Sequence, residues 1–296
     1  MEEQERTEAR LDHIRTVKPI VEALRTISMG SWRSALDWRR SLGRYQERLS
    51  RVMVSLVPHL PAPSGRQGQE RVGRMLVVII GSERGLVGGF NRTVARGTQE
   101  VLAEKEAAGA TIETVAFGTR LQRVLAQLHR PADRTRALSV SALPSFELAN
   151  ELSQHWLLQY ERGELDAVDL IYNTYRGMAK YELQVTRLIP PSLPVEDGEG
   201  EGPWPPPIIE TDPQSLYIRV VRQWTAIRLH EILLDSAAAE HSTRYQLMQS
   251  ASQTTDRLIS ELTLVLQAAR RHEITQEMLE LAAGAGLIGR REEDES

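Results

Sequence analysis

Four glycines lie close together in the segment IGSERGLVGGFN, which runs from Ile80 to Asn91. The segment follows the apolar run RMLVVII, which the sequence predicts as a buried β-strand. A glycine-rich turn after such a strand is where many α/β proteins hold a nucleotide phosphate. The first question is therefore whether this turn could bind a nucleotide.

The spacing of these residues argues against a phosphate site. A Walker-type loop ends in Gly-Lys followed by Ser or Thr, but Gly85 is followed by Leu86 and no Lys. A dinucleotide-binding turn has one residue between its first two glycines, whereas three residues separate Gly81 from Gly85. We therefore predict that Gly85, Gly88 and Gly89 shape a tight strand-to-helix turn and that the chain has no cofactor.

Other chemistry is not indicated by the composition. The seven histidines show no metal-ligand spacing, and the absence of cysteine excludes disulfides and thiol catalysis. A net charge of -4 without a basic block does not suggest nucleic-acid binding. No apolar run approaches the roughly 20 residues of a membrane span, so direct membrane insertion is not expected. We expect no catalytic or metal site and a non-enzymatic chain.

The first 57 residues carry a heptad pattern that predicts a coiled-coil helix over 1–57. Pro58 and the prolines after it end the pattern. Pro19 removes a helical hydrogen bond, so the helix either kinks there or begins there. Steps of three and four residues connect Ile14, Val17, Val21, Leu24, Ser28, Ser31, Ala35, Trp38, Leu42, Tyr45, Leu49, Val52 and Leu56.

The C-terminal part repeats this pattern and predicts a second coiled-coil helix over 212–288, followed by a charged tail over 289–296. Asp212 is a candidate N-cap, and Pro213 suits the first helical position. The same steps of three and four residues connect His241, Arg244, Met248, Ala251, Thr255, Leu258, Leu262, Val265 and Ala269.

Length indicates that these helices extend beyond a compact globule. Such a globule would be about 50 Å across, whereas the two helices would measure roughly 65 Å and 105 Å. Matching their polar stretches in an antiparallel pair places Leu49 near residue 223 and Ile14 near Leu258. Residues beyond about 262 would then continue as a single helix. Arg270 and Arg271 would be free to pair with acids on another protein, although ordinary surface charge explains them equally well.

The middle of the chain predicts an α/β domain over 72–190. Strand-like runs such as RMLVVII and TIETVAFG alternate with helical segments, which is typical of a mostly parallel sheet. The segment DAVDLIYNTYRGMAKYELQVTRLI predicts a strand that continues into a hairpin. Proline, glycine and acidic residues predict a linker over 191–211. The expected fold class is thus α/β: two long terminal helices in an antiparallel coiled coil plus a central Rossmann-like domain.

Three motifs resemble the gamma subunit of the rotary (F-type) ATP synthase. SERGLVGGFN is similar to the family segment D-R-G-L-C-G-G-L-N. The C-terminal run that begins AEHSTRYQLM and continues through LISELTL to RRHEITQEM follows the family's C-terminal signature. LDHIRTVKPIVEALRTIS follows the N-terminal helix weakly. The likeness extends over nearly the whole chain.

The resemblance implies a central rotor shaft that couples proton or sodium flow to ATP synthesis or hydrolysis. It implies alpha and beta subunits, the epsilon subunit and the membrane c-ring as partners. It also implies a peripheral position on the cytoplasmic face of the plasma membrane, with an organellar inner membrane as the alternative. The positions that match the family's contacts to the alpha–beta ring are Leu24, Arg244, Arg270, Arg271, Thr275 and Glu277.

Departures from the family pattern leave two other hypotheses. Leu24 stands where the family has Met, Arg271 where it has Gln, and Ser31 replaces a basic residue. These changes indicate a divergent gamma subunit or a gamma-like paralogue that acts as a coiled-coil scaffold outside the ATPase. The other alternative is an α/β small-molecule enzyme, which predicts a nucleotide site between Gly81 and Asn91.

Overall fold

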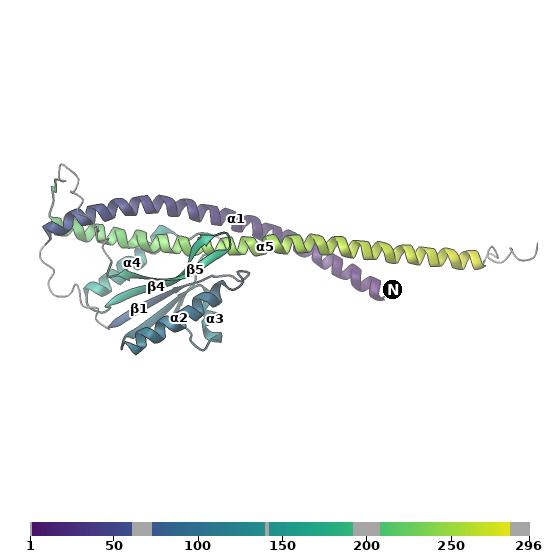
Figure 1. The fold of residues 1–296 in the computed structure, drawn as a ribbon, viewed down its shortest axis with the longest axis horizontal. Coiled ribbons are helices and arrows are strands. Elements are labelled where there is room, and N and C mark those ends of the chain that lie inside the picture. Colours follow the sequence, from purple (N-terminus) through teal and green to yellow (C-terminus); the bar gives the residue numbers. More distant parts are fainter. Residues whose placement is uncertain (1, 61–72, 140–141, 192–207, 285–296) are drawn as a thin grey trace, which may run out of the picture. The chain divides into compact units, whose positions relative to one another are not determined.

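A computed structural model describes residues 2–60, 73–139, 142–191 and 208–284 (Figure 1). Two long helices, α1 (Glu2–Leu56) and α5 (Pro213–Gly284), flank an α/β domain along the sequence. The predicted tail over 289–296 and most of the predicted linker over 191–211 lie outside the described residues.

The five strands of the α/β domain form one sheet in the order β3-β2-β1-β4-β5. β1 (Arg74–Ile80) pairs in parallel with β2 (Thr111–Phe117) and β4 (Ala167–Gly177), as the alternating sequence pattern predicts. β4 and β5 (Lys180–Ile189) form the predicted antiparallel hairpin. The short strand β3 (Arg134–Arg136) pairs with β2 and was not predicted, because its three residues are polar.

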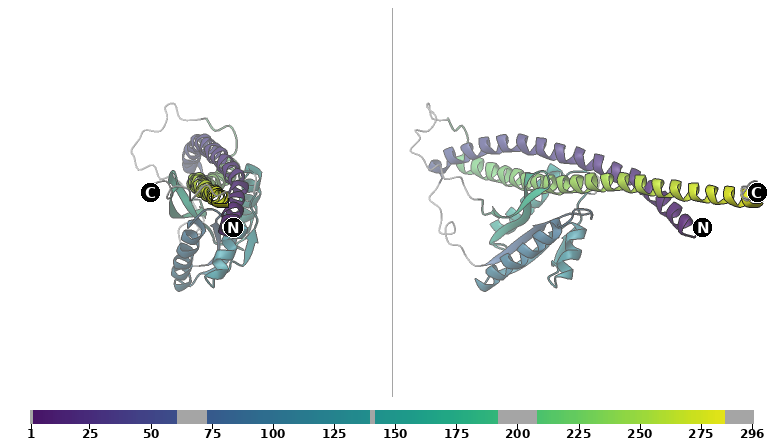
Figure 2. Two further views of the ribbon diagram at one scale, coloured as in Figure 1. Left: turned by 90° about the vertical axis from the view of Figure 1, so that its right-hand side faces the viewer. Right: turned by 45° about the vertical axis from the view of Figure 1, so that its right-hand side comes forward.

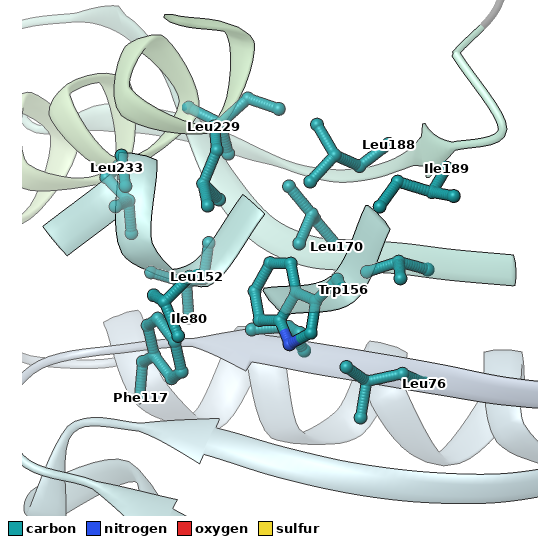
Figure 3. Packing of buried hydrophobic residues seen from close by; sticks show 14 of the residues in the cluster. Leu76, Ile80, Phe117, Leu152, Trp156, Leu170, Leu188, Ile189, Leu229 and Leu233 are labelled. Atoms are coloured by element: carbon teal, nitrogen blue, oxygen red, sulfur yellow. The ribbon is translucent and has the colours of Figure 1, made fainter. Parts of the chain in front are cut away.

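Helices cover both faces of this sheet, and β1 shows why. Its side chains alternate, so Val77 and Ile79 pack with α2 (Phe90–Ala107) and α3 (Thr119–Gln127). Leu76 and Ile80 pack on the other face, against α4 (Phe146–Glu161) and α5 (Figure 3). Burial on both faces explains why β1 is apolar throughout its length after Arg74.

Part of α5 belongs to the core of the α/β domain. Leu229, Ile232 and Leu233 are at most 1% exposed and lie in the same cluster as Trp156 of α4 (Figure 3). Residues 232–239 are buried without interruption, so this stretch of α5 is enclosed on all sides. Burial around the whole circumference is typical of a core helix, and here the stretch serves as both core helix and coiled-coil partner.

α1 and α5 pair in antiparallel orientation within residues 27–247, and again within residues 2–26 and 248–284, as predicted (Figures 1 and 2). Near the start of α5, Gln223 donates to the Tyr45 hydroxyl at 2.7 Å and the Trp224 indole donates to Ser50 at 3.0 Å. Further along, Lys18 pairs with Asp256 at 2.6 Å. These contacts agree with the register that the polar stretches predicted. At its start, Asp212 caps α5 by accepting from the Ser215 amide at 2.8 Å.

The two columns of the predicted α1 seam differ in burial. The column through Ser28, Ala35 and Leu56 is buried. The predicted second column is partly exposed, at 37% for Val17, 52% for Trp38, and 41% for both Tyr45 and Val52. Residues one position later also contact α5: Lys18, Arg25, Trp32, Arg39 and Met53. Likewise, on α5 Leu266 is 7% exposed and Val265 is 55% exposed.

The chain divides into two compact units that cut across both long helices. One comprises Met1–Thr26 with Met248–Ser296, and the other comprises Ile27–Leu247. The second unit therefore contains the α/β domain together with the adjoining stretches of α1 and α5. α1 begins at Glu2 and continues through Pro19, so of the two alternatives for this proline, the one in which the helix begins there is wrong.

Candidate interaction surface

The last turns of α5 form the most exposed helical surface in their unit. From residue 271 to 281 every side chain is exposed. Ile274, Met278 and Leu281 are 56%, 66% and 73% exposed, and their spacing of four and three residues places them on one face. A row of exposed apolar side chains on a helix is typical of a surface that a partner covers.

The opposite face of these turns explains why they are unpaired. The α5 seam runs through Leu262, Leu266 and Ala269, and its next positions are Glu273, Gln276 and Glu280. Carboxylates at seam positions disfavour a further apolar interface, since burying an unpaired charge is costly. Three apolar residues, Ile274, Met278 and Leu281, thus lie away from the seam, whereas the exposed Leu279 does not share their face. In Figure 1 the yellow end of α5 continues beyond the purple start of α1.

The pairing of the helices extends further than the sequence predicted. Arg270 Nη2 lies 2.7 Å from Glu8 Oε1, so the expectation that α5 is single beyond residue 262 is wrong for the stretch up to Arg270. The Arg270 side chain is nevertheless 63% exposed. Arg271 donates from Nε to the carbonyl of Gln267 at 3.3 Å, a contact within its own helix.

Five of the six predicted contact residues lie in one unit. Thr275 donates its hydroxyl to the Arg271 carbonyl at 2.7 Å, and Glu277 is exposed on the same turns. Leu24 is half-buried on α1. Arg244 belongs to the other unit, where it is 7% exposed. The structure thus groups Arg270, Arg271, Thr275 and Glu277 on successive turns and separates Arg244 from them.

Arg244 sits in a small polar cluster beside the glycine-rich turn. Its guanidinium pairs with Glu240 at 2.5 Å and contacts His241 Nδ1 at 3.3 Å. Burial raises the pKa of Glu240 although Arg244 opposes that shift. Burial, and then the charge of Arg244, lower the pKa of His241 to about 4. The cavity between this cluster and the Gly81–Arg84 turn has a volume of about 40 Å³, which is too small for a nucleotide.

The glycine-rich turn between β1 and α2 uses its polar groups internally. Glu83 accepts from the Thr119 amide at 3.0 Å, the Thr119 hydroxyl at 2.5 Å and the Leu138 amide at 3.0 Å. Its carboxylate therefore occupies the N-terminus of α3, where an anionic ligand would otherwise be favoured. Burial would raise the pKa of Glu83, but the hydrogen bonds outweigh it and the pKa is lowered.

The glycines of this turn have different structural roles. Gly88 adopts φ +55°, in the left-handed region that favours glycine. At Gly81 a Cβ atom would lie 2.7 Å from Leu121 Cβ, so close packing requires glycine there. At Gly85 such a Cβ would have no atom closer than 3.9 Å, and the residue has no positive φ. The turn-forming role predicted for Gly88 is thus supported by its backbone, whereas nothing in the structure requires glycine at Gly85.

Two features of these surfaces were not predicted. Leu86 is 58% exposed and has φ 62°, a conformation that is unusual for a residue other than glycine. The apolar face of Ile274, Met278 and Leu281 was also missed, although its spacing is visible in ITQEMLEL.

Among the described residues, no group of acidic and histidine side chains could hold a metal ion. Within these same ranges, no helix has the length and apolar character required to cross a membrane.

The family model described as ATP synthase matches residues 3–286, so the chain belongs to the ATP synthase family. ATP synthase gamma chains are among its curated relatives. The ATP synthase gamma chain of Anaeromyxobacter sp. (strain Fw109-5) is 29% identical over 293 residues, covering 94% of this chain and 97% of the relative. That of Rubrobacter xylanophilus is 29% identical over 282 residues, covering 94% and 96%. The likeness to a divergent gamma subunit is confirmed.

Solved structures share the fold at lower identity. A chain of the Euglena gracilis mitochondrial ATP synthase, in a structure of OSCP, F1 and c-ring, has a TM-score of 0.61 at 18% identity and covers 99% of this chain and 98% of its own. A chain from the rotor of the same enzyme has a TM-score of 0.58 at 14% identity, with coverage of 92% and 98%. The expected fold class, two long terminal helices with a central α/β domain, is confirmed.

Proposed function

We propose that this chain is the central rotor shaft of an F-type ATP synthase. As a non-catalytic subunit, it would couple ion flow across a membrane to ATP synthesis or hydrolysis in a ring of alpha and beta subunits. Membership of the ATP synthase family and nearly full-length likeness to gamma chains support this proposal. The structural observation that carries it is the end of α5, which continues beyond its pairing with α1 and bears an exposed apolar face.

The two faces of this segment suit a shaft that must act differently at each angle. Rotation shifts the equilibrium of a ring site only if the contacts made with that site change as the shaft turns. One face carries Ile274, Met278 and Leu281, and the other carries Glu273, Gln276 and Glu280. A ring site would therefore meet an apolar surface at one angle and an acidic surface at another.

We assign the ring contacts to the exposed turns of α5 from Arg270 onward, in the first unit. Arg270, Arg271, Thr275 and Glu277 are accessible there, and Leu24 lies on α1 in the same unit. Arg244 is buried beside Glu240, so we propose that it shapes the cluster beneath the glycine-rich turn rather than contacting a partner in this arrangement.

The remaining partners follow from the same proposal. The α/β domain would contact the epsilon subunit and the membrane c-ring, which would hold the chain peripherally at the cytoplasmic face of a membrane. The enzyme hypothesis is disfavoured because the Glu83 carboxylate occupies the N-terminus of α3 and the adjacent cavity measures about 40 Å³.

Co-purification tests the shaft against the paralogue hypothesis. The chain would be expressed with the alpha and beta subunits from its own source, and the product would be assayed for ATPase activity. We expect a complex with a single copy of this chain per ring, and loss of turnover when the chain is omitted. A chain that stays alone while alpha and beta assemble would favour a scaffold outside the ATPase.

A further inference from the structure

A buried carboxylate on α5 joins three elements of the second unit. Asp235 is 6% exposed in its side chain. Its Oδ2 accepts from the Thr174 hydroxyl of β4 at 2.5 Å, and its Oδ1 accepts from the Tyr175 amide at 3.2 Å. Arg39 of α1 pairs with the same Oδ1 at 3.0 Å. One side chain therefore connects the sheet, α5 and α1.

An aromatic cluster connects the same three elements beside this carboxylate. The ring of Trp32 on α1 lies 6.1 Å from that of Tyr175 on β4 and 5.9 Å from that of Tyr245 on α5. Trp32 lies one heptad before Arg39 in the interface column of α1. Tyr175 takes part in both groups, since its amide donates to Asp235. The ionic and aromatic contacts thus form one continuous junction.

The two long helices are attached to the α/β domain by different kinds of contact. α5 is held by fully buried apolar side chains, including Leu229 and Leu233. α1 meets the sheet through the Trp32 ring and through Arg39, which reaches β4 by way of Asp235. Apolar burial is non-directional, whereas hydrogen bonds and ion pairs require a defined geometry. The junction is therefore suited to fix the position of α1 against sliding.

We propose that this junction of Arg39, Asp235 and Thr174, together with the rings of Trp32, Tyr175 and Tyr245, transmits torque between the α/β domain and α1. It makes both helices of the pair turn with the domain. The proposal rests on the rotor function proposed above. Arg39, Asp235 and Thr174 are positioning residues, because they act on the shaft and contact no reacting group.

The test compares two isosteric changes on α5 in the assembled complex, reconstituted in vesicles. Asp235→Asn removes the charge at the junction. Asp256→Asn is the control, since Asp256 pairs with Lys18 between the same two helices but in the unit that lacks the sheet. ATP synthesis under an imposed ion gradient and ATP hydrolysis are measured per assembled complex, together with the melting temperature.

We expect Asp235→Asn to lower the ratio of synthesis to hydrolysis several-fold, because the Arg39 guanidinium then lacks its charged partner. Asp256→Asn should leave the ratio unchanged. Arg39→Gln provides a second variant that keeps the bonds of Asp235 to Thr174 and Tyr175, and it should lower the ratio in the same direction. If the Asp235→Asn chain does not assemble into the complex, the Arg39→Gln variant still tests the proposal.

The outcomes separate this inference from the function on which it rests. If the wild-type chain supports synthesis and the ratio is unchanged in the junction variants, the inference alone is overturned. A lower melting temperature with an unchanged ratio also overturns it, because that result shows a purely structural role. If the wild-type complex itself makes no ATP under the gradient, the proposed function is overturned and the inference with it.

Discussion

His241 illustrates how burial sets the behaviour of a single residue. Burial and the Arg244 guanidinium lower its pKa from 6.5 to about 4. The unfolded chain binds a proton here below about pH 6.5, whereas the folded chain resists it until about pH 4. The contribution of His241 to stability is therefore full above pH 6.5 and is lost as the pH falls through this window.

A His241→Gln variant isolates this contribution. The free energy of unfolding of the wild type minus that of the variant should decrease by up to about 3 kcal/mol between pH 6.5 and pH 4, at about 1.4 kcal/mol per pKa unit. Urea denaturation at several pH values measures it. Taking the difference removes the contributions of titrating groups that both proteins share. One of these is Glu240, whose raised pKa makes the folded state more stable as the pH falls. A difference that stays constant with pH would contradict the assignment.

The glycine-rich turn gives a second prediction at this scale. Gly88→Ala should destabilise the chain by about 1–2 kcal/mol, because alanine disfavours the left-handed conformation that Gly88 adopts at φ +55°. Gly85→Ala should change stability by less than about 0.5 kcal/mol, since the site is open. Chemical denaturation measures both, and equal effects would show that the two glycines share one role.

The exposed arginines of α5 give a third prediction. Replacing Arg270 and Arg271 together with Ala should reduce ATP synthesis in the assembled complex by several-fold. The stability of the isolated chain should change by less than about 1 kcal/mol, because the pair of Arg270 with Glu8 is exposed. Arg257→Ala is the matched control, because Arg257 is 70% exposed on the same helix. Equal synthesis in the double variant and the control would remove these arginines from the proposed contact surface.

At the scale of elements, α1 shows that apolar residues do not always mark the interface. Met53 is 0% exposed and packs with Leu56 and Trp224, whereas its neighbour Val52 is 41% exposed. Met53→Ala should therefore cost about 2–5 kcal/mol of unfolding free energy. Val52→Ala should cost less than about 1 kcal/mol. Thermal and urea denaturation distinguish the two, and a larger loss for Val52→Ala would restore the seam that the sequence predicted.

The strands and helices of the α/β domain could be predicted from local patterns, because apolar runs and helical periodicity depend only on residues that are close together in the sequence. The orientation of α1 about its own axis could not be predicted in full. Its interface includes Arg39, and a charged residue suits an interface only because Asp235 lies opposite. That pairing joins residues 196 positions apart. Trp38, by contrast, is apolar and fits the heptad spacing of the predicted seam, yet it is 52% exposed.

The candidate site could be predicted only in part for the same reason. The exposed turns after Arg270 follow from seam positions that become acidic, a change that is visible in the sequence. The burial of Arg244 cannot be read from the sequence in this way. It depends on Glu240 and on the Gly81–Arg84 turn, which approaches from another part of the chain. The resemblance marked Arg244 as a contact position, but a motif does not show how accessible its residues are.

At the scale of the whole molecule, α5 takes part in two different assemblies. Between Val220 and Ala239 it packs in the second unit, against α1 and the sheet. Beyond Met248 it belongs to the first unit, where it pairs with α1 up to Arg270 and then presents an exposed apolar face. A single continuous helix therefore connects the domain proposed to contact the membrane ring with the segment proposed to act on the catalytic ring.

Direct observation of rotation would show whether this chain acts as a rotor shaft. The chain has no cysteine, so Glu104→Cys on the exposed side of α2 gives it a single labelling site. A bead attached there would be followed while a surface-tethered, otherwise cysteine-free complex of this chain with alpha and beta subunits hydrolyses ATP. We expect sustained rotation in one direction that stops when ATP is removed. A complex that hydrolyses ATP at the same rate while the bead stays still would contradict it.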